Sequence, residues 1–229
     1  YHHFDIVKEG EAPPPDITVR VCESISCQLA GSEQLFRELD TSLGDAVRLQ
    51  CVPCVGRCDE APVAVVGQHP IRRANAIEVS QAIDKKNTQI ALPRGTINLE
   101  TYKAGGGYET VSKGFHEELT LDSVLGTMEA SGLRGLGGAG FPAGQKWRIV
   151  GEYPAPRLLA VNIDEGEPGT FKDRHYLERD PHRFLEGLLI SCWATEIDEV
   201  YIYVRDEYPG CLQILRESLR ELAVDLPVP

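Results

Sequence analysis

The sequence lacks any apolar run long enough to cross a bilayer. A transmembrane helix needs about 20 predominantly apolar residues, and no stretch of this 229-residue chain approaches that length. The first residues, YHHF, also carry neither the basic region nor the apolar core of a secretory signal. We therefore expect neither a membrane span nor a cleaved leader.

Basic residues are scarce relative to acidic ones. The chain has 23 Lys and Arg against 35 Asp and Glu, a formal net charge of −12 at pH 7. A field of that sign repels a phosphate backbone, so no nucleic acid is expected as a partner, although a local phosphate pocket remains allowed. Hydrophobic residues at 42% and charged residues at 25% exclude a disordered or low-complexity chain.

The hydrophobic pattern predicts two α/β regions joined by an irregular segment. Residues 1–15 end in three prolines and are expected to be extended. Residues 16–90 predict the order strand, helix, three strands and helix, which is compact enough for a thioredoxin-like unit. Residues 91–118 include three consecutive glycines and show little periodicity, so a linker is expected. Residues 119–229 alternate helices and strands, typical of a mostly parallel α/β sheet.

The expected helices and strands follow from the spacing of apolar residues and from the residues that typically begin or end such elements. Pro181 at the start of residues 181–195, for example, is typical of the first turn of a helix. Strands are expected at 17–21, 46–49, 61–67, 71–74, 158–162 and 200–204, and helices at 31–43, 76–86, 119–131, 181–195 and 210–223.

Five of the seven cysteines lie within residues 22 to 58. An odd number of cysteines without a signal sequence argues against a disulfide framework. Cys22 and Cys27 are separated by four residues and Cys54 and Cys58 by three, and each pair follows a predicted strand. Four such thiolates can hold a 2Fe–2S cluster. A zinc site, or a redox pair of Cys51 and Cys54, remains an alternative from spacing alone.

A glycine-rich loop follows the helix expected at 119–131. Gly135 to Gly140 satisfy G-x-G-x-x-G, and Asp164 follows 24 residues after Gly140. The dinucleotide-binding form of this motif must follow a strand, and here a predicted helix precedes it. Glycines still allow backbone N–H groups to approach a phosphate, and Lys146 supplies a compensating charge. A plain loop with helix caps is the alternative.

The segment CVGRCDEAP, which begins at Cys54, resembles the C-x-G-x-C-x-x-A-P signature of thioredoxin-like 2Fe–2S ferredoxins. These ferredoxins form a small subunit of respiratory NADH dehydrogenase and the fused N-terminus of NAD-linked formate dehydrogenase and hydrogenase subunits. The resemblance implies that Cys22, Cys27, Cys54 and Cys58 ligate a 2Fe–2S cluster, and it leaves Cys51 as a spare thiol.

Two further segments, GLRGLGGAGFPAGQKW and NIDEGEPGTFKDR, closely resemble the flavin-bearing subunit of the same enzymes. Their presence implies FMN and NAD as cofactors. The residues that the resemblance assigns to FMN are Gly135, Gly137, Gly138, Lys146, Asn162, Asp164 and Glu165. It places Phe141 near the nicotinamide and Glu167 in the NAD pocket. Because hydride passes directly between the two cofactors, no catalytic protein nucleophile is expected.

Two later segments, DPHRFLEG and VYIYVRDEYP, most resemble the β subunit of soluble NAD-dependent formate dehydrogenase. The resemblance implies a cytoplasmic diaphorase subunit that passes electrons between iron–sulfur clusters, FMN and NAD in formate oxidation or CO2 reduction. Its partners would be an α subunit carrying a molybdenum or tungsten pterin and iron–sulfur clusters, and a small γ subunit or the rest of the same subunit. The alternatives are the flavin subunit of NAD-reducing hydrogenase, an NADH:quinone oxidoreductase module, and a non-catalytic ferredoxin-like electron carrier.

The expected fold is therefore α/β, with a thioredoxin-like 2Fe–2S ferredoxin domain followed by the start of a Rossmann-like FMN/NADH-binding domain. Because the chain begins with Tyr1 and the cysteines of a 4Fe–4S cluster are missing before Pro229, we expect a fragment or a split subunit. A 4Fe–4S cluster is expected only in a part beyond this sequence. His175 and His182 are expected to have capping or surface roles.

Overall fold

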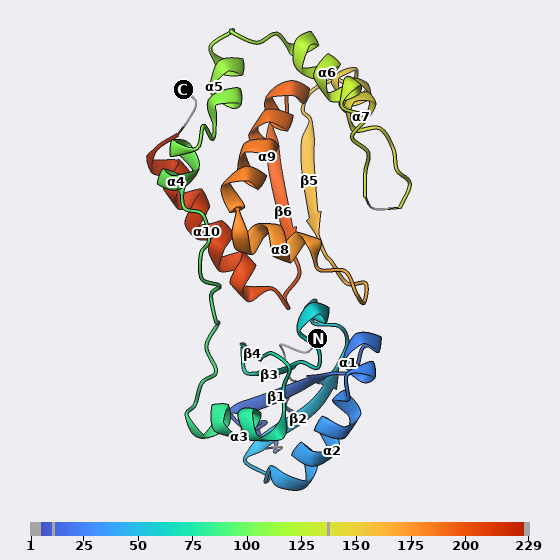
Figure 1. Cartoon of the computed structure of the whole chain (residues 1–229), viewed down its shortest axis with the longest axis vertical. Helices are drawn as coiled ribbons and strands as arrows, with labels where there is room; N and C mark the ends of the chain where they lie inside the picture. Colours follow the sequence, from blue (N-terminus) through green and yellow to red (C-terminus); the bar gives the residue numbers. More distant parts are fainter. Residues whose placement is uncertain (1–5, 11, 137, 227–229) are drawn as a thin grey trace. The chain divides into compact units, whose positions relative to one another are not determined.

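The computed structural model describes residues 6–10, 12–136 and 138–226. The chain divides into two compact units, each made of more than one stretch of sequence, and they are described separately below (Figure 1). The first unit comprises Tyr1–Arg94, Asp164–His175 and Val204–Gln213, and the second comprises Gly95–Ile163, Tyr176–Tyr203 and Ile214–Pro229.

A four-stranded sheet forms the centre of the first unit. Its strands are β1 (Ile17–Cys22), β2 (Val47–Val52), β3 (Ala64–Val66) and β4 (His69–Ile71), in the order β2-β1-β3-β4. The β-branched residues of β1 favour a strand, and β1 pairs in parallel with β2 and antiparallel with β3. The carboxyl ends of β1 and β2 therefore lie at the same edge of the sheet.

Helices α2 (Ser32–Ser42) and α3 (Ala76–Asp84) pack against one face of this sheet and against each other (Figure 1). Alternate residues of the strands point toward them, as the strand period requires. The main core under these helices contains Val19, Val21, Leu35, Leu39, Ala64, Val66, Ala74, Val79 and Ala82. The predicted thioredoxin-like order is thus confirmed.

Local differences from the expected elements are small in the first unit. The hairpin turns at Gly67 and Gln68, so β3 is shorter than the expected strand 61–67. The strand expected at 71–74 was wrong, because β4 (His69–Ile71) begins two residues earlier and shares only Ile71 with it. Two short elements were not predicted, α1 (Ile25–Leu29) and the 3-10 turn η1 (Cys58–Glu60). Both are too short to show a helical period in the sequence, and both carry a cysteine.

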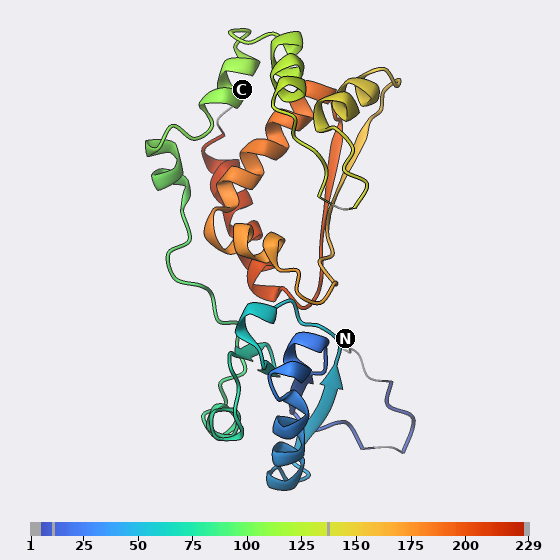
Figure 2. The ribbon, with the colours of Figure 1, turned by 45° about the vertical axis from the view of Figure 1, so that its right-hand side comes forward.

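The second unit is organised around α9 (Pro181–Thr195), which contacts α4, α5, α6 and α7. Both views show α9 running beside the two-stranded sheet (Figures 1 and 2). The elements of this part are α4 (Leu99–Ala104), α5 (Glu109–Phe115), α6 (Leu121–Ala130), α7 (Ala143–Gly151), β5 (Leu158–Ile163) and β6 (Glu199–Val204). Two further helices, α8 (Lys172–Arg179) and α10 (Pro209–Val224), belong in part to each unit.

The range 91–118, expected to be an irregular linker, contains α4 and α5. The side chain of Asn98 accepts a hydrogen bond from the Thr101 amide at 3.0 Å and caps α4. The three glycines form the turn between the helices, while Leu99 and Val111 are buried. The expectation missed these helices because each is shorter than two helical turns, which is too short for apolar residues to show a helical spacing.

His182 lies fully buried within the second unit, so the expected capping or surface role was wrong. Its Nδ1 is 3.0 Å from the Tyr108 hydroxyl and its Nε2 is 3.0 Å from Glu221 Oε2. Pro181 at the first turn of α9 directs this part of the helix into the interior. Burial raises the pKa of Tyr108, so its hydroxyl stays protonated.

Among the described residues, no helix combines the length and apolar character that crossing a membrane requires.

Candidate functional site

Parallel pairing of β1 and β2 brings the two cysteine pairs together. Cys22 is the last residue of β1 and lies opposite Val52, the last residue of β2. Cys54 follows two residues after β2, and Cys27 lies in α1 directly after β1. Because both strands end at the same sheet edge, their following loops meet there.

The four predicted ligands form one group of buried thiols. Cys22 and Cys27 are each 1% exposed, Cys54 is 4% exposed, and Cys58 is half-buried. The sulfurs of Cys54 and Cys58 are 3.4 Å apart, and the Cys22 thiol hydrogen-bonds with Cys27 and Cys54. The structure therefore brings together all four residues that the sequence resemblance assigns to a cluster.

Close packing of the thiols opposes their ionisation. The hydrogen bond with Cys22, together with burial, raises the pKa of the Cys54 thiol. Burial also raises the pKa of the Cys58 thiol. Four thiolates at this spacing would need cations to compensate their charge, and iron bound to sulfur supplies such compensation.

The four thiols suit a metal group that is bound through sulfur. Four cysteine thiolates are the donor set of a 2Fe–2S cluster, so the residues present fit the cluster. A structural zinc ion can also be held by four cysteines, and the preference for iron rests on the resemblance of the CVGRCDEAP segment.

Cys51 does not join this group. It is exposed on β2, and burial together with the neighbouring Glu23 carboxylate raises the pKa of its thiol. Its spacing from Cys54 matches a redox dithiol, but Cys54 turns instead toward Cys22 and Cys58. The structure therefore places Cys51 apart from the four predicted ligands, and its role as a spare thiol stays a prediction.

Two distant stretches of the same unit, residues 164–175 and 204–213, contact the loop between Cys54 and Cys58. We call these stretches the clamp segments. The most direct contact is a hydrogen bond from the Gly169 amide to Cys58 Sγ at 3.1 Å. A clamp segment more than 100 residues away in sequence therefore donates a hydrogen bond to the sulfur of a predicted ligand, Cys58.

Arg205 makes the second contact and is only 6% exposed. Its guanidinium donates to the Cys54 carbonyl oxygen at 2.6 Å and to the Glu165 carbonyl oxygen. It also pairs with Glu207, whose carboxylate lies 3.0 Å away. The planar guanidinium of Arg205 thus links Cys54, a predicted ligand, to both clamp segments.

Arg174 and Tyr208 complete the set of contacts at Gly56, in the middle of the ligand loop. Arg174 Nε donates to the Gly56 carbonyl oxygen at 3.0 Å, and its Nη2 pairs with Asp59 at 2.5 Å. The Tyr208 hydroxyl donates to the same carbonyl at 3.4 Å. Arg174 is 4% exposed and Tyr208 is 1% exposed, so these polar groups are buried with their partners.

Glu165, which the resemblance assigns to the flavin, lies almost fully buried within this network (3% exposed). Its carboxylate accepts hydrogen bonds from the Asp173 amide at 3.0 Å and the Arg174 amide at 3.3 Å, at the start of α8. The Tyr208 hydroxyl is 3.1 Å from the same carboxylate. A carboxylate at a helix N-terminus is favoured by the helix dipole. The role of Glu165 toward a flavin stays a prediction.

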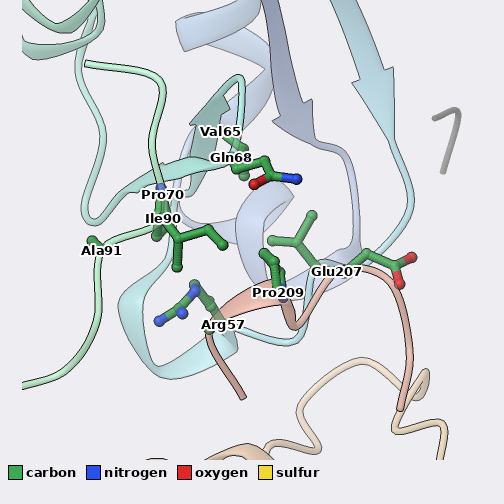
Figure 3. A pocket seen from close by; sticks show the side chains of 10 residues that line it. Arg57, Val65, Gln68, Pro70, Ile90, Ala91, Glu207 and Pro209 are labelled. Carbon is green, nitrogen blue, oxygen red and sulfur yellow. The ribbon is translucent and has the colours of Figure 1, made fainter. Parts of the chain in front are cut away.

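A small pocket lies where the clamp segment around Pro209 meets the face of the sheet that α2 and α3 do not cover. Val65 and Pro70 from the sheet, together with Ile90, Glu207 and Pro209, are among the residues that line it (Figure 3). The space accommodates little more than a water molecule. This pocket is too small for a nucleotide cofactor.

The glycine-rich loop belongs to the second unit and closes on itself. The Gly135 amide donates to the Phe141 carbonyl oxygen at 3.0 Å, and the Arg134 guanidinium donates to the Gly140 carbonyl oxygen at 2.9 Å. Gly138 has a φ of +110°, a conformation that other residues rarely adopt. The loop thus adopts a backbone conformation that favours glycine, and a Cβ atom built at Gly138 would meet no other atom within 4 Å.

Helix α7 begins directly after this loop. Its N-cap position is Pro142, which offers no side-chain cap, and the amide of Ala143 donates to the Leu133 carbonyl oxygen at 2.8 Å. An anion at this end of α7 would therefore face the amides that follow Ala143. Lys146 lies exposed in the next turn, Phe141 is 45% exposed at the loop's end, and Asn162 is exposed at the end of β5. Gly137 lies outside the described residues.

The remaining predicted cofactor residues, Asp164 and Glu167, lie exposed in the first unit, in the loop that leads to Gly169. Sequence reasoning did not single out Arg205 and Tyr208. Both lie within a quoted resemblance segment, but no local pattern distinguishes a buried arginine from a surface one.

Comparison with known protein families gives one match in each half of the sequence. Residues 1–87 match the family described as thioredoxin-like 2Fe-2S ferredoxin. Residues 128–226 match the Nuo51 FMN-binding domain. The chain is therefore a fusion of a thioredoxin-like 2Fe–2S ferredoxin domain with part of an FMN-binding domain of the NADH-dehydrogenase type.

Similar proteins include subunits of NADH-dependent oxidoreductases. The chain is 44% identical over 124 residues to an NADH-quinone oxidoreductase subunit of Aquifex aeolicus, covering 54% of this chain and 29% of that one. It is 44% identical over 109 residues to the mitochondrial NADH-ubiquinone oxidoreductase 51 kDa subunit of Neurospora crassa, covering 45% and 22%. The chain is thus homologous to these oxidoreductase subunits, and the match spans less than a third of their length.

A solved structure resembles nearly the whole chain. The crystal structure of NAD+-reducing NiFe hydrogenase in the air-oxidized state contains a chain that is 29% identical, with a TM-score of 0.75. That similarity covers 93% of this chain and 41% of the hydrogenase chain. The two-domain fusion therefore recurs in a hydrogenase.

Proposed function

We propose that this chain is part of a diaphorase subunit that passes electrons between iron–sulfur clusters, FMN and NAD. The observation that carries the proposal is the group of four thiols at one end of a thioredoxin-like sheet, in a chain that also matches an FMN-binding domain. FMN exchanges hydride with nicotinamide, whereas a 2Fe–2S cluster carries one electron, and a protein with both can convert one form of transfer into the other.

The chain's own residues would mainly bind and orient. The start of α7, which has no side-chain cap, and the charge of Lys146 suit the FMN phosphate. Gly135, Gly137 and Gly138 would allow close approach of the flavin, with Phe141 beside the nicotinamide. In the same proposal, four residues contact the cofactors from the end of β5 and the loop after it: Asn162, Asp164, Glu165 and Glu167.

The first test is the cofactor content of the native complex. We expect one FMN for each 2Fe–2S cluster, NADH-dependent reduction of a dye, and an EPR signal of the reduced cluster after NADH is added. A 2Fe–2S spectrum without FMN and without dye reduction would instead identify a non-catalytic ferredoxin-like electron carrier and would overturn the diaphorase proposal.

For the partner, we propose the α subunit of a soluble NAD-dependent formate dehydrogenase, with a molybdenum or tungsten pterin and iron–sulfur clusters. The support is the resemblance of DPHRFLEG, which begins at Asp180, and VYIYVRDEYP, which begins at Val200. A nickel–iron hydrogenase partner is the second candidate, favoured by the structural similarity over 93% of the chain. An NADH:quinone oxidoreductase module is the third, favoured by the identity to the Aquifex aeolicus protein.

These partners differ in metal and substrate. The chain would be affinity-tagged in its native host, and the co-purifying large subunit identified by mass spectrometry and metal analysis. Molybdenum or tungsten with formate-dependent NAD+ reduction supports the first candidate. Nickel with hydrogen-dependent NAD+ reduction supports the second, and co-purifying membrane subunits support the third.

A further inference from the structure

The ligand loop between Cys54 and Cys58 is held by buried polar groups of the clamp segments (residues 164–175 and 204–213). Arg205 and Tyr208 donate to the backbone carbonyls of Cys54 and Gly56. Arg205, Arg174 and Tyr208 are all more than nine-tenths buried. Burying a guanidinium is costly unless its donors are satisfied, and here the satisfying acceptors belong to the cluster loop.

These contacts fix the loop and also set its electrostatics. Two buried guanidinium groups donate N–H groups to carbonyls of the loop that supplies two of the four thiols, and each is paired with a carboxylate, Arg205 with Glu207 and Arg174 with Asp59. The Gly169 amide points directly at Cys58 Sγ, at 3.1 Å. Hydrogen bonds to ligand sulfurs, and N–H groups directed at the ligand loop, stabilise the reduced cluster, which carries one more negative charge.

We propose that the clamp segments raise the reduction potential of the 2Fe–2S cluster. The Gly169 amide acts on the sulfur itself, and Arg205 and Arg174 act as positioning residues through the Cys54 and Gly56 carbonyls. The inference rests on the proposed function, because it requires that the four cysteines hold this cluster.

The test is an EPR-monitored redox titration of the purified complex. Arg205→Gln removes the charge and the hydrogen-bonding fork, so the equilibrium constant for one-electron reduction should fall about tenfold, which is about 59 mV to lower potential. Arg205→Lys keeps the charge and should recover part of this shift. Arg20→Gln is the matched control, since Arg20 is equally buried and donates to the Gly67 carbonyl, outside the ligand loop.

Tyr208→Phe and Arg174→Lys keep the test decisive if Arg205→Gln fails to assemble. Each removes a hydrogen bond to the Gly56 carbonyl while preserving the ring or the charge. We expect both to shift the potential in the same direction by a smaller amount.

The outcomes separate the two proposals. A complex without any 2Fe–2S signal in the unchanged protein overturns the proposed function. A normal cluster whose potential is the same in unchanged protein, Arg205→Gln, Tyr208→Phe and Arg174→Lys overturns the clamp inference alone. A shift of equal size in Arg20→Gln also overturns it, because the effect would then be a general loss of buried charge.

Discussion

At the residue scale, Gly56 permits the closest approach between the ligand loop and a clamp segment. Its φ is +69°, and a Cβ atom built there would come within 2.1 Å of the Tyr208 hydroxyl oxygen. The aromatic ring of Tyr208 occupies the space where any other residue would place its side chain. The contact therefore depends on the absence of a single methyl group.

Gly56→Ala should lower the free energy of unfolding of the first unit by about 2 to 4 kcal/mol, because it combines backbone strain with overpacking. Chemical denaturation followed by cluster absorbance measures the change. Gly44→Ala is the control, since a Cβ atom there meets nothing within 4 Å. Equal stability of the two variants would show that Tyr208 does not approach Gly56 as described.

The buried pair of Tyr108 and His182 gives a second prediction at this scale. Tyr108→Phe leaves His182 Nδ1 without its partner and should cost about 1 to 2 kcal/mol of stability. The denaturant midpoint measures this loss. Tyr203→Phe, at a site where the residue is 61% exposed, should leave the midpoint unchanged. An unchanged midpoint in Tyr108→Phe would contradict the hydrogen bond.

At the element scale, the glycine-rich loop and α7 form a continuous structure with uncapped amides. Helix α7 packs closely on α6, since a Cβ atom at Gly144 would lie 2.6 Å from the Glu129 backbone nitrogen. Arg148 on α7 pairs with Glu129 at 2.9 Å. The helix that would face the FMN phosphate is thus held in place by its contacts with α6, and no side chain caps its N-terminus.

Lys146→Gln should weaken FMN binding by roughly tenfold to a hundredfold, because a charge-assisted contact to phosphate contributes about 1.5 to 3 kcal/mol. Quenching of flavin fluorescence during titration of the FMN-depleted complex measures the dissociation constant. Lys113→Gln, on α5 of the same unit, serves as the control and should bind FMN normally. Equal affinities in the two variants would remove Lys146 from the proposed phosphate site.

At the scale of the whole molecule, the seven cysteines divide into an exposed thiol, a cluster set and two others. Among the seven cysteines, all of which the structure describes, only Cys51 is exposed, while the four predicted ligands lie at one sheet edge. Cys192 is half-buried on α9, and Cys211 is buried on α10. The reactivity of thiols therefore reports on the state of the cluster.

Removing iron with a chelator under reducing conditions should free four further thiols. When the thiols of this chain are counted by mass spectrometry of its labelled peptides, we expect one rapidly reacting thiol in the intact complex, Cys51, because the predicted ligands are occupied by iron. After iron removal the count on this chain should rise by four, and thermal unfolding of the first unit should begin at lower temperature. A thiol count that does not change on chelation would contradict the cluster assignment.

Much of the fold followed from local patterns. The alternation in residues 17–21 and the proline at the start of α9 placed these elements correctly, because strand and helix periods are local properties. Residues 99–115 were mistaken for a linker, since α4 and α5 are short and gain stability from buried contacts such as that of Tyr102 with Glu186, 2.5 Å apart.

The sequence by itself determined the chemistry: the cysteine spacing and the CVGRCDEAP segment specify which thiols could hold iron, and the glycine-rich string specifies where a phosphate could bind. Only the tertiary structure decided that Arg174, Arg205, Tyr208 and Gly169 reach the cluster loop from more than 100 residues away. The physical reason is that spacing encodes ligands within one loop or strand end. A buried arginine takes its role from the carbonyl that satisfies it, and that partner is fixed only when the chain folds.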